Sequence, residues 1–415
     1  MKKWLFILLL LPSLTSFAQN DSVFSLVNCE HLFISNNLNL LAAKFNVEAA
    51  QASVIQARLW ENPSLSFEFN AYNPDGNKFF DIGSDGDKSF GLEQLIHLGG
   101  KKHNEIELAR TNATIAQLEF TDLLRNLKLQ LRESYFAIYY DNLSYQAIVN
   151  QMESLNLLIQ EYDKQVSKGN IAMKDLVRLK SLYLDFRSKK SELFKNITEN
   201  QSNLTLLIGK ETIKVQPETK ELSIYSANKL PAIDSMYQSA ISNRPDYQIA
   251  EKQVEANAWN LKWQKSLVVP DITVGANYSQ RAGAFPNALT VSLGIPLELW
   301  NRNQGNIKAA DAQMKASKVS KDYLKNKVMQ DVVLAKKNWK ESIENSKLIN
   351  TETMQNFKSV SESMFMNFKH GNVSLIEFTD FLESYTQSIL QYNQLGKQLV
   401  NSCENINYYT SSTIF

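Results

Sequence analysis

The chain has 415 residues, of which 44% are hydrophobic and 21% are charged, so it can bury a large core and is not an intrinsically disordered protein. The 44 lysines and arginines balance 43 aspartates and glutamates, which argues against a protein that binds nucleic acid through its net charge. Only 14 glycines and 9 prolines are present, and this small share of turn-forming residues predicts long, uninterrupted helices.

Residues 1–18 have the features of a signal peptide. Two lysines precede an apolar run from Trp4 to Leu14, and small residues follow up to Ala18. The mature protein is therefore expected to begin near Gln19 and to lie outside the cytoplasm. No later stretch reaches the ~20 apolar residues that a membrane-spanning helix needs, so the mature chain is expected to be soluble or to cross a membrane only as β-strands.

The chain contains an internal duplication. Residues 39–65 match residues 246–272 at a constant offset of 207, and later segments match at offsets of 201 and 202. We predict a first repeat over 19–208 and a second repeat over 232–415, joined by a polar linker over 209–231. One duplicated unit then has to explain the function.

Each repeat contains a segment in which apolar and polar residues alternate. This period of two predicts a β-hairpin over about 64–97 and a second one over about 271–297. Loops rich in turn-forming residues, 73–87 and 281–287, connect the strands of each hairpin. Strands of about ten residues have the length of transmembrane β-strands.

A long helical hairpin is predicted after each β-hairpin. The first spans about 101–207 with its tip at 169–170, and the second spans about 302–408 with its tip at 371–372. Between residues 148 and 166, apolar residues recur alternately four and three positions apart, which is typical of coiled-coil packing.

Four strands per chain are too few to close a membrane barrel, because the smallest such barrels have about eight strands. An open sheet in lipid would leave backbone groups without hydrogen bonds. The chain is therefore expected to form oligomers. Three copies would give a mainly α-helical trimer with a 12-stranded membrane β-barrel, continuous with a barrel of long helices.

Three sequence features resemble the TolC-type outer membrane efflux proteins. They are the segment 243–246 (Asn-Arg-Pro-Asp) that begins the second copy, the Gly-Asn tips, and the segment 296–305, Pro-Leu-Glu-Leu-Trp-Asn-Arg-Asn-Gln-Gly. The last segment is most similar to the CzcC/CusC-like cation-efflux branch. The resemblance covers essentially the whole mature chain.

This resemblance implies a homotrimeric channel in the outer membrane with a large periplasmic portion. Its helical tips would dock on a periplasmic membrane fusion (adaptor) protein, which links it to an inner-membrane transporter of the RND type. The cargo would be heavy-metal cations or small toxic compounds. Two alternatives are the outer membrane duct of a protein-secretion system and a non-transport periplasmic coiled-coil scaffold, although a scaffold leaves the two β-hairpins without a role.

No group of residues in the sequence predicts an enzyme, a cofactor or a metal centre. The four histidines, His31, His97, His103 and His370, are not spaced as metal ligands, and each is expected to be solvated or to cap a helix. The loop 81–87 is rich in Asp and Gly. Weak Ca²⁺ binding is one reading of this loop, and an acidic, solvated loop is the favoured one.

Several residues around the hairpins have expected roles. Glu68 and Glu93 fall on the polar face of their strands and are expected to line the barrel lumen, where they would favour cations. Trp60 and Trp300 flank the first and last strands, so they are expected at the membrane interface, with ordinary helix-to-strand packing as the alternative. Three phenylalanines in the opposite loops are expected to form an outer girdle or to fold over the mouth: Phe79, Phe80 and Phe285.

The helical tips are the predicted adaptor-docking sites, because they are the turns farthest from the strands. Their residues are Gly169, Asn170, Asp175, Gly371 and Asn372, with basic residues Lys164, Lys168, Lys174, Lys369 and His370 close by in the sequence.

The resemblance also implies a periplasmic gate at Glu377 and Asp380, which lie three residues apart and so share one face of a helix. The first copy has Asp175 and Arg178 at these places. The alternative is that the two acids only complement the helix dipole.

Two cysteines, Cys29 and Cys403, lie at opposite ends of the mature chain. A disulfide between them is chemically allowed outside the cytoplasm, and two buried thiols fit the sequence equally well.

Overall fold

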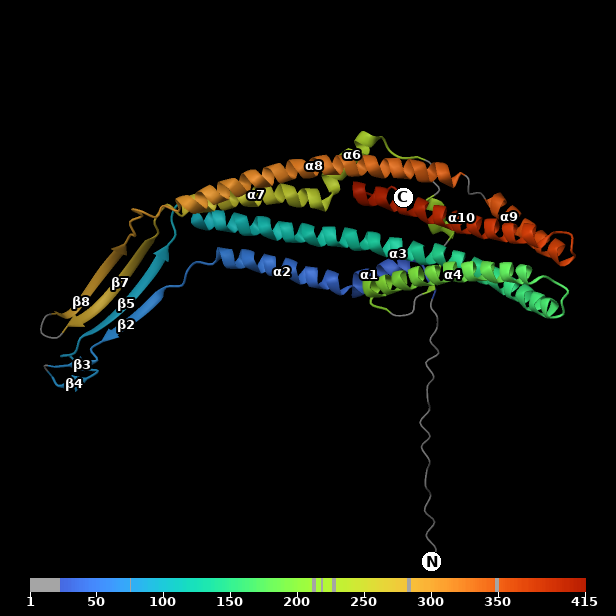
Figure 1. Ribbon diagram of the computed structural model, residues 1–415. Coiled ribbons are helices and arrows are strands. Elements are labelled where there is room, and N and C mark those ends of the chain that lie inside the picture. The colour runs from blue at the N-terminus through green and yellow to red at the C-terminus, as the bar shows by residue number, and fades with distance from the viewer. Residues whose placement is uncertain are drawn as a thin grey trace, which may run out of the picture.

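The computed structural model describes residues 23–74, 76–210, 214–217, 219–225, 229–281, 285–347 and 351–415. The predicted signal peptide, 1–18, lies outside the described residues. Figure 1 shows an elongated chain with a β-sheet at one end, the tips of two helical hairpins at the other, and a layer of long helices between them.

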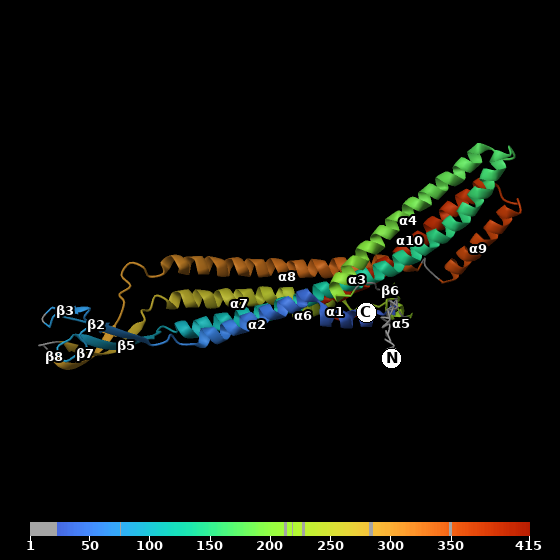
Figure 2. The ribbon, with the colours of Figure 1, turned by 90° about the horizontal axis from the view of Figure 1, so that it is seen from below.

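Four helices lie side by side in the half of the layer next to the sheet. In lateral order they are α2 (Leu38–Arg58), α3 (Lys101–Ser167), α7 (Pro245–Ser266) and α8 (Gln304–Ser346), and each contacts the next. In the half next to the tips lie α4 (Met173–Ile208), α9 (Thr351–Lys369) and α10 (Leu375–Thr410), beside the far end of α3. Figure 2 shows that the layer bends between its two halves.

The long helices are built as the sequence predicts. No glycine or proline interrupts the 67 residues of α3, and its predicted coiled-coil residues Ile148, Met152 and Leu155 are buried against α4 and α10 in a cluster near the tips. The outgoing limb of the second hairpin differs from the expectation, because α8 ends at Ser346 and α9 begins at Thr351. The Ser346 hydroxyl donates to the Ile343 carbonyl, a contact that competes with the helical backbone bonds.

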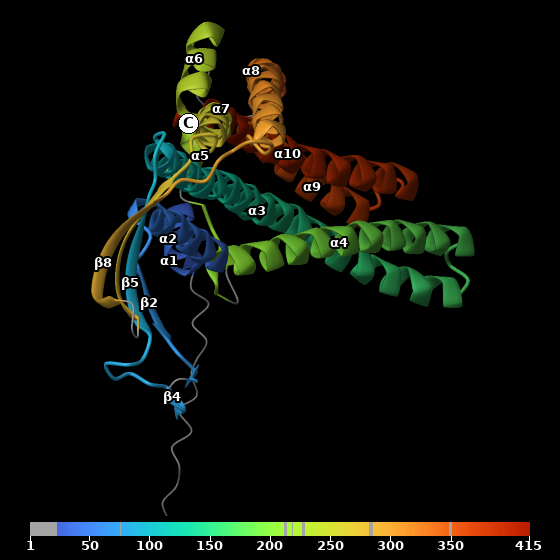
Figure 3. The same cartoon turned by 90° about the vertical axis from the view of Figure 1, so that its left-hand side faces the viewer.

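The described residues form a four-stranded antiparallel sheet. Its strands are β2 (Ser64–Phe69), β5 (Lys88–Ile96), β7 (Ile272–Arg281) and β8 (Phe285–Gly294), in the order β2-β5-β7-β8. This is also the lateral order of the helices that continue from them, so β2 and β8 are open edges. Figure 3 shows β2, β5 and β8 bowed along their length.

The first hairpin loop was expected to be irregular, but it contains a small hairpin of its own. Residues Tyr72–Asn73 (β3) pair with Lys78–Phe79 (β4). The chain therefore leaves the main sheet early, and β2 has 6 residues instead of the expected ten. Phe285, expected in the second loop, begins β8 instead.

The same pattern of helices occurs twice along the chain. α1 (Leu26–Asn36) and α6 (Ile233–Asn243) have 11 residues each, and α4 and α10 have 36 residues each. In the first set α4 ends against the start of α2, and in the second set α10 ends beside α6 and the start of α7 (Figure 1). We call these two meeting points the first joint and the second joint.

The main core lies around the two joints. Its largest fully buried side chains include Phe33, Leu131, Tyr135, Phe136 and Leu204. The segment expected as a linker also packs here, because β6 (Lys214–Val215) pairs in parallel with β1 (Val23–Phe24), and a short helix, α5 (Thr219–Ile224), leads to the buried Tyr225.

Both cysteines are in the described part of the chain and lie in this core as thiols, not as a disulfide. Burial, helped by the charge of Glu404, raises the pKa of the Cys403 thiol to about 12, so it stays protonated at neutral pH. Among the described residues, no helix is long and apolar enough to cross a membrane.

Candidate functional site

The sheet has one polar face and one apolar face, as its alternating sequence predicts. The strand register pairs Glu68 with Ser89 and Glu93 with Gly275 and Ser64, so both glutamates project from the same face. The polar face carries Ser64, Ser66, Glu68, Ser89, Glu93, Asn277, Ser279, Thr290 and Ser292. Both glutamates are exposed, and Glu68 accepts a hydrogen bond from the Ser89 hydroxyl at 3.3 Å.

Large apolar side chains cover the opposite face and remain exposed in the single chain. They include Leu65, Phe67, Phe69, Phe90, Leu92, Val274, Leu289, Val291 and Leu293. The rings of Phe67 and Phe90 lie edge to face, 5.3 Å apart between centroids. A sheet with this much exposed apolar surface needs a non-aqueous neighbour.

His97 lies just before α3, where the sheet meets the helices. It was expected to be solvated or to cap a helix, but its side chain is only 18% exposed and pairs with an aspartate. Its Nδ1 lies 3.0 Å from Oδ2 of Asp271, and Oδ1 of the same carboxylate accepts from Lys101 Nζ at 2.7 Å. The Leu98 backbone N–H also donates to Oδ1 of Asp271, at 3.1 Å. Asp271 therefore ties the end of the first β-hairpin to the start of the second. The other three histidines, His31, His103 and His370, are exposed.

The two predicted interface tryptophans lie at this same end of the sheet. Trp60 is 58% exposed and stacks on the His97 ring, and Trp300 is 86% exposed. Ordinary helix-to-strand packing does not account for Trp300 within one chain.

The acidic loop after β4 is more ordered than expected, because Asp81 and Asn73 are buried. The Asp81 carboxylate accepts from the Asn73 amide and the Gly83 backbone N–H, each at 3.1 Å. Lys88 and Gln280 donate to backbone carbonyls of the same loop. Hydrogen-bond donors thus occupy both carboxylate oxygens, and no group of three acidic, histidine or cysteine side chains among the described residues is arranged to hold a metal ion.

The two hairpin tips have the same backbone structure. Gly169 and Gly371 adopt φ values of +76° and +74°, which only glycine adopts without strain. In each tip the glycine N–H donates to the carbonyl three residues back, and the N–H of Asn170 or Asn372 donates to the carbonyl five residues back. This is the usual way in which a left-handed residue ends a helix.

The two candidate gate acids are exposed but differ in their contacts. The Glu377 carboxylate accepts from the backbone N–H and hydroxyl of Ser374, which form a capping box at the start of α10. These hydrogen bonds hold the pKa of Glu377 below its ordinary value.

Asp380 accepts instead from Arg178 Nη2 at 2.9 Å, and Arg178 Nε donates to the Thr379 hydroxyl at 2.9 Å. Arg178 and Asp380 occupy the same place in the two helical hairpins, at the offset of 202. The sequence analysis identified Arg178 as the first-copy counterpart of Asp380 but did not predict this contact between the hairpins.

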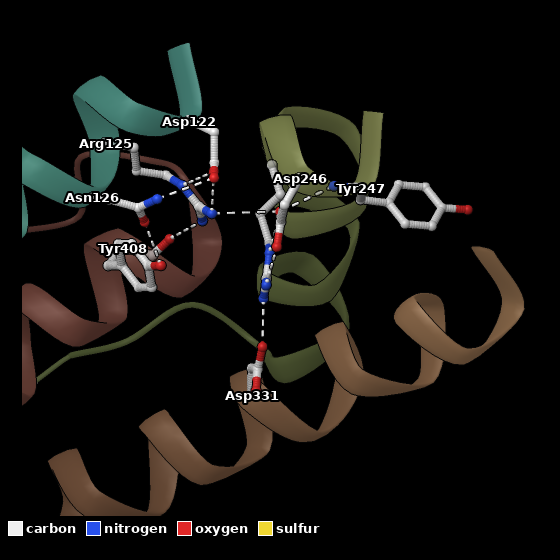
Figure 4. A network of polar contacts seen from close by, with 8 residues as sticks. Asp122, Arg125, Asn126, Asp246, Tyr247, Asp331 and Tyr408 are labelled. Atoms are coloured by element: carbon white, nitrogen blue, oxygen red, sulfur yellow. Dashed lines mark hydrogen bonds and ion pairs between the residues drawn. The ribbon is translucent and has the colours of Figure 1, made fainter. Parts of the chain in front are cut away.

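The Asn-Arg-Pro-Asp segment at the start of α7 belongs to a buried polar network that the sequence analysis did not predict (Figure 4). Arg244, 3% exposed, donates to both carboxylate oxygens of Asp246 at 3.0 and 2.7 Å and to Asp331 of α8 at 2.9 Å. Arg125 of α3 donates to Asp122, contacts Asp246, and reaches the Tyr408 carbonyl near the end of α10. The duplication could have pointed to Arg244 as a structural residue, because it matches the helix-capping Asn37 at offset 207.

A second buried network lies on the same side of α3. Arg132 donates from Nε to Glu30 at 2.7 Å and from Nη1 to both oxygens of Glu404 at 2.7 and 2.9 Å. The Tyr225 hydroxyl donates to Glu404 at 2.5 Å. These bonds join α1, α3, α10 and the segment between the repeats.

Comparison with known proteins gives a consistent picture. A family model described as outer membrane efflux protein matches residues 31–210 and 236–410. The cobalt-zinc-cadmium resistance protein CzcC of Cupriavidus metallidurans is 20% identical over 363 residues, which cover 87% of this chain and 84% of that protein.

Solved structures of low sequence identity share the fold. A crystal structure of CusC aligns with a TM-score of 0.74 at 18% identity, covering 94% of this chain and 92% of that chain. The Campylobacter jejuni CmeC outer membrane channel aligns with a TM-score of 0.72 at 14% identity, covering 94% of this chain and 86% of that one.

Proposed function

The chain belongs to the outer membrane efflux protein family, which makes it an outer membrane channel for efflux. We propose that three copies of it form the exit duct of a tripartite system for heavy-metal cations. In this assembly each chain contributes two copies of one unit, residues 19–208 and 232–415. A periplasmic adaptor protein and an inner-membrane transporter of the RND type are the proposed partners.

The observation that carries the proposal is that the chain is a single layer with two open flanks. One flank consists of β2, α2 and α4, and the other consists of β8, α8 and α9 (Figure 1). Each of these edge strands has a neighbour in the sheet on one side only. An unpaired strand edge in lipid is too costly to persist.

Exposed apolar side chains continue along both flanks. On the first flank they are Leu38, Leu41, Phe45 and Ile55 of α2 and Val177, Leu184 and Phe194 of α4. On the second flank they are Val319, Tyr323 and Leu334 of α8 and Val360 and Met366 of α9. Within α2 these residues fall in one stripe, at the spacing of a helix that packs on another helix.

Joining the second flank of one copy to the first flank of the next would satisfy the strand edges and bury both stripes together. Three copies close a ring of twelve strands, which is within the range of known membrane barrels. The exposed apolar face of the sheet would then meet lipid, with Trp60 and Trp300 at the interface. The polar face, with Glu68 and Glu93, would line the lumen.

The proposed substrate class rests on charge and on one relative. The two lumen carboxylates per chain become six in a trimer, and such rings concentrate cations and repel anions. CzcC, which matches most of this chain, is named for resistance to cobalt, zinc and cadmium. Heavy-metal cations fit both observations.

The tips are proposed to bind the adaptor and to close the duct. The two tips have matching turns at Gly169-Asn170 and Gly371-Asn372, and nothing packs over either glycine. Asp175, in the first turn of α4, is the other residue proposed for docking. Glu377 and Asp380 are proposed to form the periplasmic gate. The bond from Arg178 to Asp380 supports a closed arrangement in which one gate carboxylate per chain is held by a cation.

Ion selectivity in a planar bilayer tests this function. The purified protein should form channels whose reversal potential in a salt gradient shows a preference for cations. Replacing Glu68 and Glu93 together by Gln should remove most of that preference, whereas Ser279→Ala on the same face should leave it unchanged. Channels with no cation preference, or a preference unaffected by the double change, would overturn the lumen assignment.

A further inference from the structure

Two cavities flank α3 in the middle of the molecule, one beside each joint. The amide cavity, about 600 Å³, lies at the first joint and is lined by side chains that include Asn37, Gln130, Glu133, Asn203 and Asn401. The basic cavity, about 310 Å³, lies at the second joint, between α3, the start of α7 and the end of α10. The amide cavity is also lined by α2 and α4 of the first flank, whereas the basic cavity lies on the central helices, away from both open flanks.

Three cationic side chains and one carboxylate line the basic cavity, and Glu30, Asp122 and Asp246 pair with these cations from outside the lining. Arg125, Lys128 and Arg132 line it from one stripe of α3, at spacings of three and four residues. The one carboxylate in its lining, Glu404, has a side chain only 4% exposed and is already bonded to Arg132 and Tyr225. The amide cavity has one cation in its lining, Lys397, which is paired with Asp141, and one acid, Glu133, whose pKa is raised by burial and by the charge of Glu404.

Hydrogen-bond donors in the basic cavity remain available to a ligand. Arg132 uses Nε and Nη1, and its Nη2 has no acceptor within the part of the chain that the structure describes. Lys128 Nζ has a single ion-pair partner there, Glu30 at 3.4 Å, and its side chain is 46% exposed. The Ser411 hydroxyl is buried with no partner among the described residues.

Apolar side chains form the rest of the wall. Leu124 and Leu129 of α3 and Pro245 of α7 line the cavity together with the Tyr408 side chain of α10. A volume of about 310 Å³ is at the lower end of the range for small-molecule sites. The cavity thus combines a cationic end with an apolar wall, in a space suited to a ligand with few heavy atoms.

We propose that the basic cavity is a binding site for a small organic carboxylate with an apolar body. Lys128 and Arg132 would bind the carboxylate through charge-assisted hydrogen bonds, and Leu124, Leu129 and Pro245 would contact the apolar body. Since Pro245 begins α7 and Tyr408 lies near the end of α10, the ligand contacts both helices of the second joint as well as α3. Occupancy therefore stiffens that joint.

Direct binding measurements test this proposal on the full-length protein in lipid nanodiscs, so that no detergent competes. The probes are 4-phenylbutyrate, 4-phenylbutan-1-ol, which has the same body without the charge, and acetate, which has the charge without the body. We expect 4-phenylbutyrate to bind and the other two to bind at least about tenfold more weakly. The alcohol lacks a charge-assisted hydrogen bond, which contributes roughly that factor, and acetate lacks the apolar body that the wall would contact.

Lys128→Met should weaken 4-phenylbutyrate binding by about tenfold. The matched control is Gln130→Met, two residues along the same helix in the wall of the amide cavity, which should leave binding unchanged. Both residues are on the surface, and unaltered circular dichroism would show that both variants are folded. The proposal is overturned if 4-phenylbutyrate does not bind, if the alcohol binds equally well, or if Lys128→Met has no more effect than Gln130→Met.

Discussion

In the first repeat α4 ends against α2 at a joint held by Asn37. In the second repeat α10 ends beside α7 at a joint whose buried residue is Arg244, and Arg125 of α3 bridges the two helices. Asn37 is 4% exposed; its side-chain oxygen accepts from the Leu40 N–H at 2.9 Å and its amide donates to the Leu207 carbonyl at 2.8 Å. One neutral side chain therefore caps α2 and binds the end of α4.

At the matching position, Arg244 is equally buried but works through charge. It binds Asp246 and Asp331, and its guanidinium lies 5.9 Å from the centre of the Tyr409 ring. The difference shows that one helix-to-helix joint can be held by two neutral hydrogen bonds or by a network of buried ions. A buried ion pair whose partner is removed leaves an uncompensated charge, so the two joints are expected to respond differently to mutation and to pH.

The largest effect is expected from Arg244→Met. This change leaves the partly exposed carboxylates of Asp246 and Asp331 without the buried cation that pairs with them, and should reduce the free energy of unfolding by about 3 kcal/mol, the lower end for a broken buried ion pair. Thermal unfolding followed by circular dichroism measures the loss. Arg244→Lys keeps the charge but loses the two-pronged geometry, so its unfolding temperature should lie between those of the wild type and Arg244→Met.

A smaller effect is expected from Asn37→Ala at the first joint. The change removes a helix cap and one buried hydrogen bond, which together stabilise the fold by about 1–3 kcal/mol. The same unfolding measurement should show a smaller drop than for Arg244→Met. A drop as large or larger would contradict the distinction between a neutral and a charged joint.

At low pH the two joints should differ further in how much they stabilise the fold. Burial opposes ionisation of Asp246, but the hydrogen bond and charge of Arg244, aided by Arg125, outweigh it and hold the pKa of Asp246 below its ordinary value. The stabilisation is therefore complete above the unfolded-state pKa of about 3.9 and is lost as the pH falls through the lower folded-state pKa.

Unfolding temperatures measured between about pH 5 and pH 3 test this dependence. Asp246→Asn should be less stable than the wild type at pH 5 and should lose less stability on acidification. Parallel pH profiles for the two proteins would contradict the assignment.

The smallest effect on stability is expected at the tips, where the repeats contact each other through Arg178 and Asp380. Both side chains are largely exposed, and such pairs contribute about 0–1 kcal/mol. Arg178→Gln should therefore barely change the unfolding temperature. The change should instead free the Asp380 carboxylate and increase the cation preference of the channel in single-channel recordings. Lys180→Gln, two residues along α4, is the matched control. An unchanged preference would count against a gate at this position.

Sequence periodicity predicted the features that depend on local structure. Alternation along the strands predicted the polar face with Glu68 and Glu93, and the scarcity of glycine predicted the length of α3 and the turns at Gly169 and Gly371. The duplication predicted that the helices of one half recur in the other.

The features that the sequence did not predict depend on contacts between distant residues. His97 and Asp271 are 174 positions apart, and Arg178 and Asp380 are 202 apart. No period in the sequence indicates which side chains meet across the layer. The buried Asp81 was missed for a different reason, since an acidic residue in a polar loop is usually exposed and only the folded β3–β4 hairpin surrounds it with donors.

The central claim is that one chain is a third of a closed duct, and native mass spectrometry of the mature protein released from lipid nanodiscs tests it most directly. The open edges β2 and β8 and the apolar stripes of α2 and α8 predict an assembly of three chains, with no stable monomer. A monomer as the main species under conditions that preserve membrane complexes would contradict the account.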